Sequence, residues 1–536
     1  MHHRCLLIPI VVALFLCSIV CINAIETTTL HTTYGDVVGV VDRSAPIPVA
    51  VFKGIPFAEP PVSELRWKRP VPIKAWSPKV LNATQPKASC AQFGKVQVEH
   101  GPNTQNFVLS EDCLYLNLYI PHAKTADDKM ALMVFVHGGS FTSGSANAIA
   151  YNALNLSRSE NVMVAVIQYR LGILGFMAAS ELQKEDPHQS TGMYGMQDQR
   201  EAFLFLKQLF RDGSCGPVTL FGESAGGASV LFHTLLAGSN SQGLFDQVIA
   251  ESPAPWRTPT LPVALASTAK VAAMLQMSPP LNVQALRQVE WEVLVAAANN
   301  LSLLTQGKEV FIPVIDDSEW SKPPLKLLEE GVGLQMKGPV MIGHNANEGT
   351  VFEIQNLLVN DTGYRELLRA SFNTSFAREL YTLYNPQDYA TPFGAISAVF
   401  GDAVIACPAF LAATFYRTSY RYLFTAPLTP ILGACHTVEL AFVFQNQVTY
   451  DGLPFPFDAA RQSLAVGTSA AWSSFAFTGI PVVGTRSYDA PNWPSLQASG
   501  QTMTLGLEGG KLVKEVQDNE RVCGMWLQFF RDGGFA

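Results

Sequence analysis

The sequence predicts an α/β protein. Short apolar, β-branched runs alternate along the chain with helical stretches, which is typical of sheets layered with helices. The chain has 536 residues, of which 48% are hydrophobic and 15% charged. It can therefore bury a large core, and its composition excludes a disordered protein. No repeats or low-complexity tracts interrupt it, and its proline-rich stretches resemble loops on the sheet more than domain boundaries.

The expected strands follow one another at intervals along the chain. They cover 132–136, 161–167, 218–221, 246–250, 340–342 and 420–424. The first ends at Gly138 and Gly139. The third runs directly into a glycine turn and a helix from Ala225 to about Leu236.

The first two dozen residues have the pattern of a secretory signal peptide. His2, His3 and Arg4 form a basic start, an apolar run covers 6–20, and Ala24 offers a small residue for cleavage. We expect residues 1–24 to be removed and the protein to be secreted; the alternative is an uncleaved anchor. The C-terminus carries neither a hydrophobic tail nor an ER-retrieval signal, so no stable membrane anchor is expected.

Charge and cysteine content narrow the set of possible functions further. The net charge is −8, with 36 basic and 44 acidic residues, which argues against a nucleic-acid partner. Six of the nine cysteines lie after the signal peptide, an even number that permits disulfides. No CxxC or HxxxH spacing occurs, so neither a metal nor a cofactor is expected. Together with a signal peptide, the N-x-[ST] sequons predict glycosylation at Asn82, Asn155, Asn300, Asn360 and Asn373.

The most informative segment is the GxSxG motif at 222–226. A strand that turns sharply into a helix exposes its central residue, here Ser224, at the helix N-terminus. Gly222 and Gly226 are required because a Cβ there would collide with the neighbouring strand and helix. Such a motif also occurs as a plain glycine turn with a solvated serine. The flanking strand and helix favour a catalytic nucleophile.

This segment resembles the nucleophile elbow of the type-B carboxylesterase/cholinesterase family of α/β-hydrolases. Other blocks resembling that family occur in order at 52–58, 65–67, 111–117, 169–172 and 198–199. The resemblance runs from about residue 35 to 530. It implies an α/β-hydrolase fold: one domain over 25–536 with a large, mostly parallel central sheet, flanking helices and long loops forming an active-site gorge.

The resemblance also assigns an oxyanion hole. The HGG sequence at 137–139 follows a strand, as a loop of this type should. By resemblance, the backbone N–H groups of Gly139, Ser140 and Ala225 are the donors. The family usually has a small residue where Ser140 stands, so Ser140 must adopt a backbone conformation open to a residue with a Cβ.

A serine nucleophile needs a histidine base, and the histidine needs an orienting carboxylate. His436, in the block 433–440, resembles the catalytic histidine of the family, and Glu348, in an N-x-x-E-G block after a strand, resembles its acid. The order serine, acid, histidine is that of α/β-hydrolases. On position alone His233 and His344 are alternative bases, and the rival carboxylates are Asp316 and Asp317, in a block that is structural in the family.

Other residues resemble supporting groups of the family. Glu223 resembles a glutamate that tunes the electrostatics around the histidine, and Ser252 is a further candidate partner of the triad. Arg66 with Glu111 and Arg170 with Asp198 resemble internal ion pairs. The resemblance pairs Cys90 with Cys113 and Cys407 with Cys523. Cys215 and Cys435 are left over.

These parts predict a secreted serine esterase that works through an acyl-enzyme, with a small-molecule ester as its partner. Choline esters are the less favoured substrate, because residues 91–112 lack the tryptophan that binds the choline group in cholinesterases and contain only Phe93 and Phe107 as aromatics. The alternative is a catalytically silent adhesion or storage protein of the same fold. The sequence makes no prediction of oligomeric state.

Overall fold

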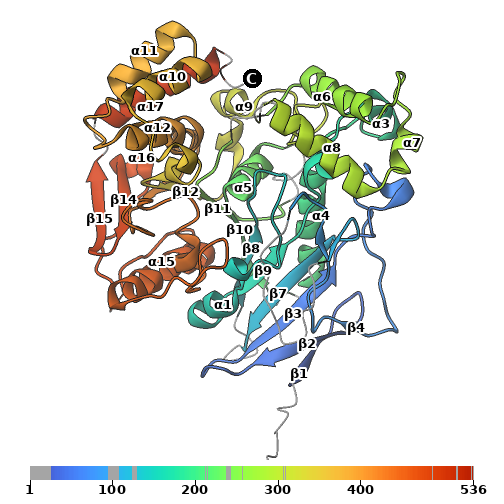
Figure 1. Cartoon of the computed structure of the whole chain (residues 1–536). Helices are drawn as coiled ribbons and strands as arrows, with labels where there is room; N and C mark the ends of the chain where they lie inside the picture. The colour runs from blue at the N-terminus through green and yellow to red at the C-terminus, as the bar shows by residue number, and fades with distance from the viewer. Residues whose placement is uncertain are drawn as a thin grey trace, which may run out of the picture.

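The computed structural model describes residues 26–534 apart from 95–107, 123–128, 212, 214, 237–242, 256–257, 306, 308–309, 486, 515–516 and 533 (Figure 1). The expected signal peptide, residues 1–24, and Phe107 lie outside the described residues.

One sheet of thirteen strands organises the described chain (Figure 1). Its order is β1-β2-β3-β7-β9-β8-β10-β11-β12-β13-β14-β15, with β4 paired to β2. The central strands from β9 to β14 run parallel, whereas β1, β2, β3 and β7 at one end and β15 at the other pair antiparallel. The strands are β1 (Thr27–Leu30), β2 (Val37–Asp42), β3 (Val49–Pro56), β4 (Leu81–Asn82), β7 (Tyr115–Pro121), β8 (Met130–Val136), β9 (Met163–Ile167), β10 (Cys215–Glu223), β11 (Gln247–Glu251), β12 (Val340–Asn345), β13 (Ser419–Phe424), β14 (Gln501–Gly506) and β15 (Gly509–Lys514). The α/β class and the large, mostly parallel sheet expected from the sequence are confirmed.

All six expected strands occur in this sheet, with small shifts at their ends. The largest shifts are three residues: β12 ends at Asn345 instead of Ile342, and β10 begins at Cys215 instead of Val218. A proline within a run usually argues against a strand, and Pro217 stands there. In the structure the ladder between β10 and β8 shifts its register between Cys215 and Val218, which accommodates that proline.

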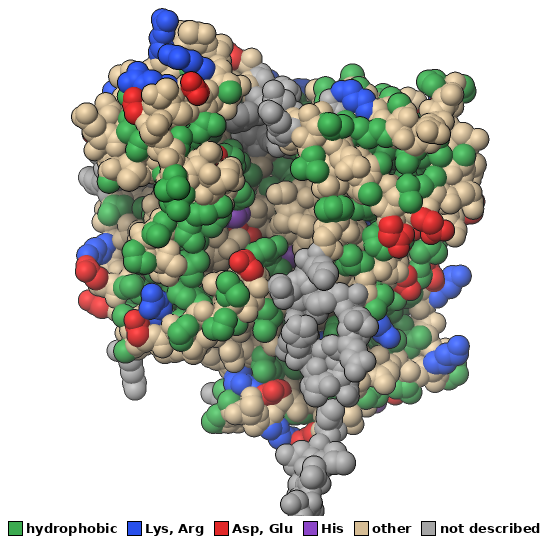
Figure 2. Space-filling model, viewed as in Figure 1, with side chains coloured by type: hydrophobic (Ala, Val, Ile, Leu, Met, Phe, Trp, Pro, Cys, Tyr) green, Lys and Arg blue, Asp and Glu red, His purple; other side chains and the backbone are tan. Residues whose placement is uncertain are grey.

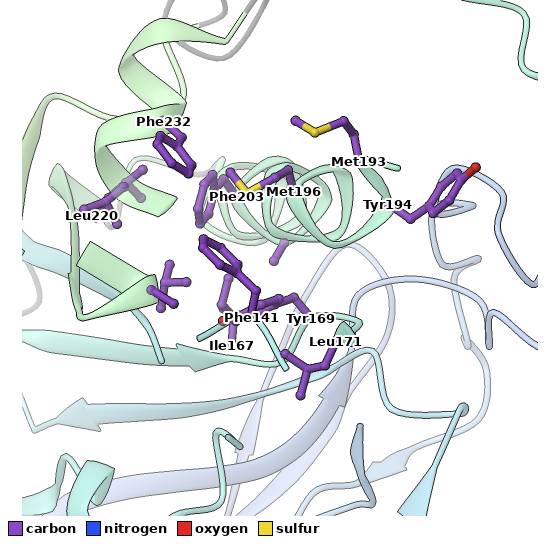
Figure 3. Close-up of a cluster of buried hydrophobic side chains, with 14 of the residues drawn as sticks. Phe141, Ile167, Tyr169, Leu171, Met193, Tyr194, Met196, Phe203, Leu220 and Phe232 are labelled. Carbon is purple, nitrogen blue, oxygen red and sulfur yellow. The ribbon is translucent and has the colours of Figure 1, made fainter. Parts of the chain in front are cut away.

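Helices cover both faces of the sheet and bury two large hydrophobic clusters. They include α4 (Tyr194–Leu209), α5 (Ala225–Leu235), α6 (Leu261–Met274), α8 (Trp291–Leu304), α10 (Asp361–Ser371), α12 (Pro392–Gly401), α13 (Cys407–Thr414), α15 (Ala459–Thr478) and α17 (Gln517–Arg531). Others are α1 (Leu154–Glu160), α2 (Gly172–Phe176), α3 (Ser180–Glu185), α7 (Val283–Arg287), α9 (Pro324–Glu329), α11 (Thr374–Leu383), α14 (Leu440–Val443) and α16 (Leu496–Ser499). Figure 3 shows Phe203 and Met196 of α4 and Phe232 of α5 gathered with Leu220 of β10 in one cluster. Burying apolar surface stabilises a fold by roughly 25 cal/mol per Å². This packing holds α5, and therefore its N-terminus, against the sheet.

One apolar helical stretch among the described residues, 392–414, has the length and hydropathy of a membrane span. It comprises α12, a π-helical turn and α13, and about two thirds of its most apolar window is buried inside the protein. This is the pattern of a core helix.

Both expected disulfides are present. Cys90 is bonded to Cys113, and Cys407 of α13 is bonded to Cys523 of α17. Cys215 and Cys435 take part in neither bond.

Candidate active site

Ser224 lies at the turn between β10 and α5, as the GxSxG motif predicts. Its backbone has φ 58° and ψ −121°, a conformation that L-residues rarely adopt. The turn is possible because its flanking glycines lack a Cβ: at Gly222 a Cβ would lie 2.6 Å from the Gly226 carbonyl carbon, and at Gly226 one would lie 1.9 Å from the Val136 oxygen. The Ser224 N–H donates to the Glu251 carbonyl, 2.9 Å away, which ties the turn to β11.

The loop after β8 packs directly against this turn. A Cβ at Gly138 would lie 3.0 Å from the Ser224 Cβ, so the loop and the serine are in close approach. Gly139 has φ 107° and Ser140 φ 54°, and the latter is the left-handed region that a residue with a Cβ can reach at some cost. Within the described part of the chain, the N–H groups of Gly139, Ser140 and Ala225 donate to no other group. These three N–H groups are thus available for an oxyanion.

His436 and Glu348 are brought together from segments 88 residues apart. The His436 Nδ1 lies 2.6 Å from the Glu348 Oε2, and both residues are buried. Glu348 also accepts hydrogen bonds from the Ser252 hydroxyl and the Asn345 N–H, both at 2.6 Å. Burial raises the pKa of Glu348, but the facing His436 and these hydrogen bonds outweigh burial and lower its pKa. Glu348 is therefore an ionised carboxylate that fixes the histidine ring.

Glu223 lies against the other nitrogen of the ring, with its Oε1 3.1 Å from the His436 Nε2. Since Glu223 precedes Ser224 in the chain, this contact brings the histidine to the Ser224 turn. Burial lowers the pKa of His436, but Glu223 and Glu348 outweigh it and raise the pKa. Burial also raises the pKa of Glu223. The pair can hold one proton between them.

Two further buried carboxyl groups lie around this site, and neither was assigned a role in the sequence analysis above. Glu251 meets Glu223 across the β10–β11 ladder and accepts a hydrogen bond from Trp472 Nε1 at 3.0 Å. Glu439 accepts one from the Asn345 side chain. Burial, the largest cause, raises the pKa of both carboxyl groups. Repulsion from Glu439 raises the pKa of Glu251 further, and repulsion from Glu348 does the same for Glu439. Strand register could have revealed Glu251, because it pairs with Glu223, the residue before Ser224.

The alternative residues occupy other environments. His233 contacts the Gln199 amide oxygen at 2.9 Å, and His344 contacts the Asn345 carbonyl at 3.0 Å. Asp316 accepts hydrogen bonds from the Ser190 hydroxyl and from the backbone N–H groups of residues 318–320, so it shapes a turn. Asp317, the other rival carboxylate, lies in the same turn, where its N–H donates to the Trp320 carbonyl.

The expected ion pairs are both present away from the triad. Arg66 contacts Glu111 at 2.5 Å, and Arg170 contacts Asp198 at 2.7 Å with both side chains buried. Arg66 also donates to the carbonyls of Val289 and Arg287, and Arg170 donates to that of Lys68. These pairs therefore join separate chain segments.

The remaining site features lie at the surface. The five sequon asparagines, at 82, 155, 300, 360 and 373, are all exposed. Asn360 and Asn373 also cap α10 and α11. In the described ranges no cluster of three or more His, Cys, Asp or Glu is arranged to hold a metal ion.

Comparison with known proteins identifies the family of the chain. Residues 26–526 match the model of the carboxylesterase family. A fumonisin B1 esterase from Sphingopyxis macrogoltabida is 32% identical over 90% of this chain and 86% of its own length. An acetylcholinesterase from Bungarus fasciatus and a cholinesterase from Mus musculus are each 29% identical over 90% of this chain and 83% of their own lengths. The chain belongs to the carboxylesterase family and is a carboxylic-ester hydrolase with an α/β-hydrolase fold.

Proposed function

We propose that the protein is a secreted serine esterase in which Ser224, His436 and Glu348 form the catalytic triad and neutral carboxylic esters are the substrates. The observation that carries this proposal is His436 held between Glu348 and Glu223, beside the strained turn of Ser224. Strained backbone persists where surrounding structure fixes it, and it gathers at functional sites.

The reaction uses these groups in two steps. The Ser224 oxygen attacks the ester carbonyl carbon while His436 takes the serine proton, and then His436 gives this proton to the leaving alcohol. The product of this step is an acyl-enzyme on Ser224. His436 next removes a proton from water, which attacks the acyl carbon, and returns the proton to Ser224 as the acid leaves. Glu348 keeps the ring oriented and stabilises the imidazolium in both steps.

The negative charge that develops on the carbonyl oxygen needs fixed donors. The N–H groups of Gly139, Ser140 and Ala225 would supply them, with the N-terminus of α5 adding its dipole. Each such donor is worth roughly 3 kcal/mol of transition-state stabilisation. The positive φ of Ser140 supports this assignment, because a left-handed turn reorients the backbone N–H there.

A neutral ester is the proposed substrate. The first disulfide loop, 91–112, has no tryptophan to hold a cationic head group. The chain resembles both cholinesterases and an esterase named for fumonisin B1, so family membership alone does not require a choline ester. The net charge of −8 agrees with a cationic substrate but does not select one.

Secretion is proposed from the N-terminal sequence and the cysteines. Residues 1–24 have the order of a signal peptide, and two disulfides fit an oxidising compartment. The exposed sequons are suitable for glycosylation of the mature domain, 25–536.

Labelling with a serine-reactive organophosphate tests the nucleophile. We expect one adduct, on the peptide that contains Ser224, and loss of nitrophenyl acetate hydrolysis. Ser224→Ala should abolish both the adduct and the activity, whereas Ser371→Ala, at an exposed serine of α10, should keep both. No adduct and no hydrolysis in the wild type would favour the silent adhesion or storage protein instead.

A panel of nitrophenyl, alkyl and choline esters of equal acyl length tests the substrate class. We expect the neutral esters to have the higher kcat/KM. A clear preference for the choline ester would overturn the argument from the missing tryptophan.

A further inference from the structure

The loop that follows β8 contains a tight reverse turn at residues 139–142. The Thr142 N–H donates to the Gly139 carbonyl at 3.0 Å, and the two central residues, Ser140 and Phe141, have φ values of 54° and 61°. Both values lie in the left-handed region, which is unfavourable for a residue with a Cβ and is usually occupied by glycine or asparagine. The turn is therefore strained at two successive residues.

Phe141 holds this strained turn in place. Its side chain is buried, and its ring centroid lies 6.3 Å from that of Phe232 and 5.5 Å from that of Phe176. Figure 3 shows the ring among the buried side chains of α4 and α5. The Phe141 carbonyl also accepts a hydrogen bond from the Gly172 N–H at 2.7 Å. Because its neighbour is anchored in this way, Ser140 keeps its unusual conformation.

The three hydroxyl groups of this loop are used differently. Those of Thr142 and Ser143 donate to the Gly139 carbonyl, at 3.4 Å and 3.2 Å. The Ser140 side chain is exposed, and its hydroxyl makes no hydrogen bond within the described part of the chain. Glycine would fit the same backbone with less strain. The Ser140 side chain thus adds strain to the turn and no bond to it, which favours a role toward a bound molecule.

The Ser140 hydroxyl can reach the same atom as the Ser140 N–H. In two of the three staggered rotamers of a serine, the hydroxyl oxygen is gauche to the backbone nitrogen and roughly 3 Å from it. One oxygen atom in front of the N–H can therefore accept from both groups. This N–H is one of the three that the proposed function assigns to the oxyanion, and the loop approaches the nucleophile closely, since a Cβ at Gly138 would lie 3.0 Å from the Ser224 Cβ.

The molecule offers a substrate access to this region. Figure 2 shows a hollow between the part that carries α10 and α12 and the part that carries α6 and α8, with histidine side chains inside it. In Figure 1, α5, which begins next to Ser224, lies between these two parts. Of residues 138–143, all of them described, Ser140 alone is exposed. It is therefore the residue of the loop that a bound ester can contact most readily.

We propose that the Ser140 hydroxyl is a fourth donor to the oxyanion, beside the three backbone N–H groups. It donates to the carbonyl oxygen as Ser224 attacks, and the bond weakens again when the carbonyl re-forms, so no proton is transferred. A hydrogen bond to an ionised oxygen is stronger than one to a neutral carbonyl, so the hydroxyl favours the transition state over the bound substrate. This inference rests on the proposed function, because it takes Ser224 as the nucleophile.

Ser140→Ala and Ser140→Gly test the hydroxyl with a short nitrophenyl ester. Alanine keeps the Cβ and loses only the hydroxyl, whereas glycine loses both and relieves the positive φ. We expect kcat to fall roughly 10²-fold in both variants while KM stays within about twofold of wild type. Ser140→Gly should also melt at a higher temperature than Ser140→Ala, because glycine adopts this backbone without strain. The enzyme would then be less stable with serine than with glycine at this position, but more active.

A transition-state analogue gives an independent readout. A phenyl trifluoromethyl ketone adds to the Ser224 oxygen, and the former carbonyl oxygen of the adduct carries the negative charge of an oxyanion. The inhibition constant of Ser140→Ala should rise by about the same factor as its kcat/KM falls. Partial unfolding of the variant would lower the measured kcat and leave the inhibition constant unchanged, so this readout distinguishes a lost donor from a structural defect.

The matched control is Thr142→Val, which removes a hydroxyl of the same turn and keeps the shape of the side chain. It should keep the wild-type kcat and inhibition constant. Wild-type kcat in Ser140→Ala, or an inhibition constant that does not change, would overturn the inference, and so would a loss that appears only in KM. Failure of the proposed function is a separate result, because it would show as no hydrolysis and no organophosphate adduct in the wild type.

Discussion

The protein buries carboxyl groups in two contrasting surroundings. Glu319, under the edge of α4, faces Arg200 at 2.7 Å and Arg69 at 2.8 Å. Around His436, the side chains of Glu223, Glu348 and Glu439 are buried, and the buried Glu251 pairs with Glu223 in the neighbouring strand. Burial alone would raise the pKa of Glu319, but its two guanidinium groups lower that pKa to about 2, whereas the pKa of Glu251 is raised well above its usual value.

The difference lies in the available positive charge. Glu319 and Glu251 are both deeply buried, so burial does not explain the difference between their pKa values. A buried charge without a partner costs several kcal/mol, and a carboxyl group in that position keeps its proton instead. The arginine pairs therefore fix the structure, whereas Glu223, Glu251 and Glu439, whose pKa values are raised, favour their protonated forms close to where the proposed reaction moves a proton.

The largest effect is expected at Glu348, the buried carboxylate that contacts His436. Glu348→Gln keeps the shape of the side chain but loses the carboxylate that orients His436, so we expect kcat to fall roughly 10⁴-fold with little change in melting temperature. Hydrolysis of a short nitrophenyl ester measures it. Glu353→Gln, five residues further along, is the control and should keep kcat. Near-normal kcat in Glu348→Gln would assign the orienting role to Glu223.

Variants of the buried arginine pairs should show the opposite result: they should lose stability and keep activity. Arg170→Ala leaves Asp198 buried without its cation, and we expect about 3–5 kcal/mol less free energy of unfolding, measured by denaturant titration. The folded fraction should keep its kcat. Lys322→Ala breaks an exposed pair with Glu330 and should cost less than about 1 kcal/mol. Equal losses in the two variants would remove the distinction between buried and exposed pairs.

The smallest effect concerns Glu251 and depends on pH. Since the folded-state pKa of Glu251 is raised, its contribution to stability is complete below about pH 4.5 and is lost as pH rises. The loss amounts to roughly 1 kcal/mol per pH unit until the folded-state pKa is reached. Gln cannot ionise, so Glu251→Gln should gain stability relative to wild type between pH 5 and pH 8.

Melting temperatures at several pH values measure this gain. The control Glu508→Gln, at an 88% exposed side chain, should show no such trend. Parallel melting curves for wild type and Glu251→Gln across this range would mean that Glu251 titrates normally in the folded protein.

Features carried by a recognisable block of sequence could be predicted, including the distant Cys407–Cys523 disulfide, whereas contacts made by strand pairing could not. The turn at Ser224 depends on neighbours within two residues, and its glycine requirement is met in the structure. Glu251 and Glu439 could not be assigned from their own surroundings, because their meeting with Glu223 depends on strand register and on the approach of the His436 loop. Phe352 likewise could not be assigned from its own surroundings, because its contact with the His436 ring is made only by the fold.

The parallel order of β10, β11, β12 and β13 has a consequence for how such a protein can evolve. Ser224, Glu348 and His436 all follow strands of this group and converge at one rim, although more than 200 residues separate the first from the last. The loops and helices that connect these strands lie outside the sheet, and they do not set the spacing of the three side chains. Insertions there can change which substrates the enzyme accepts while the proposed reactive centre is inherited intact.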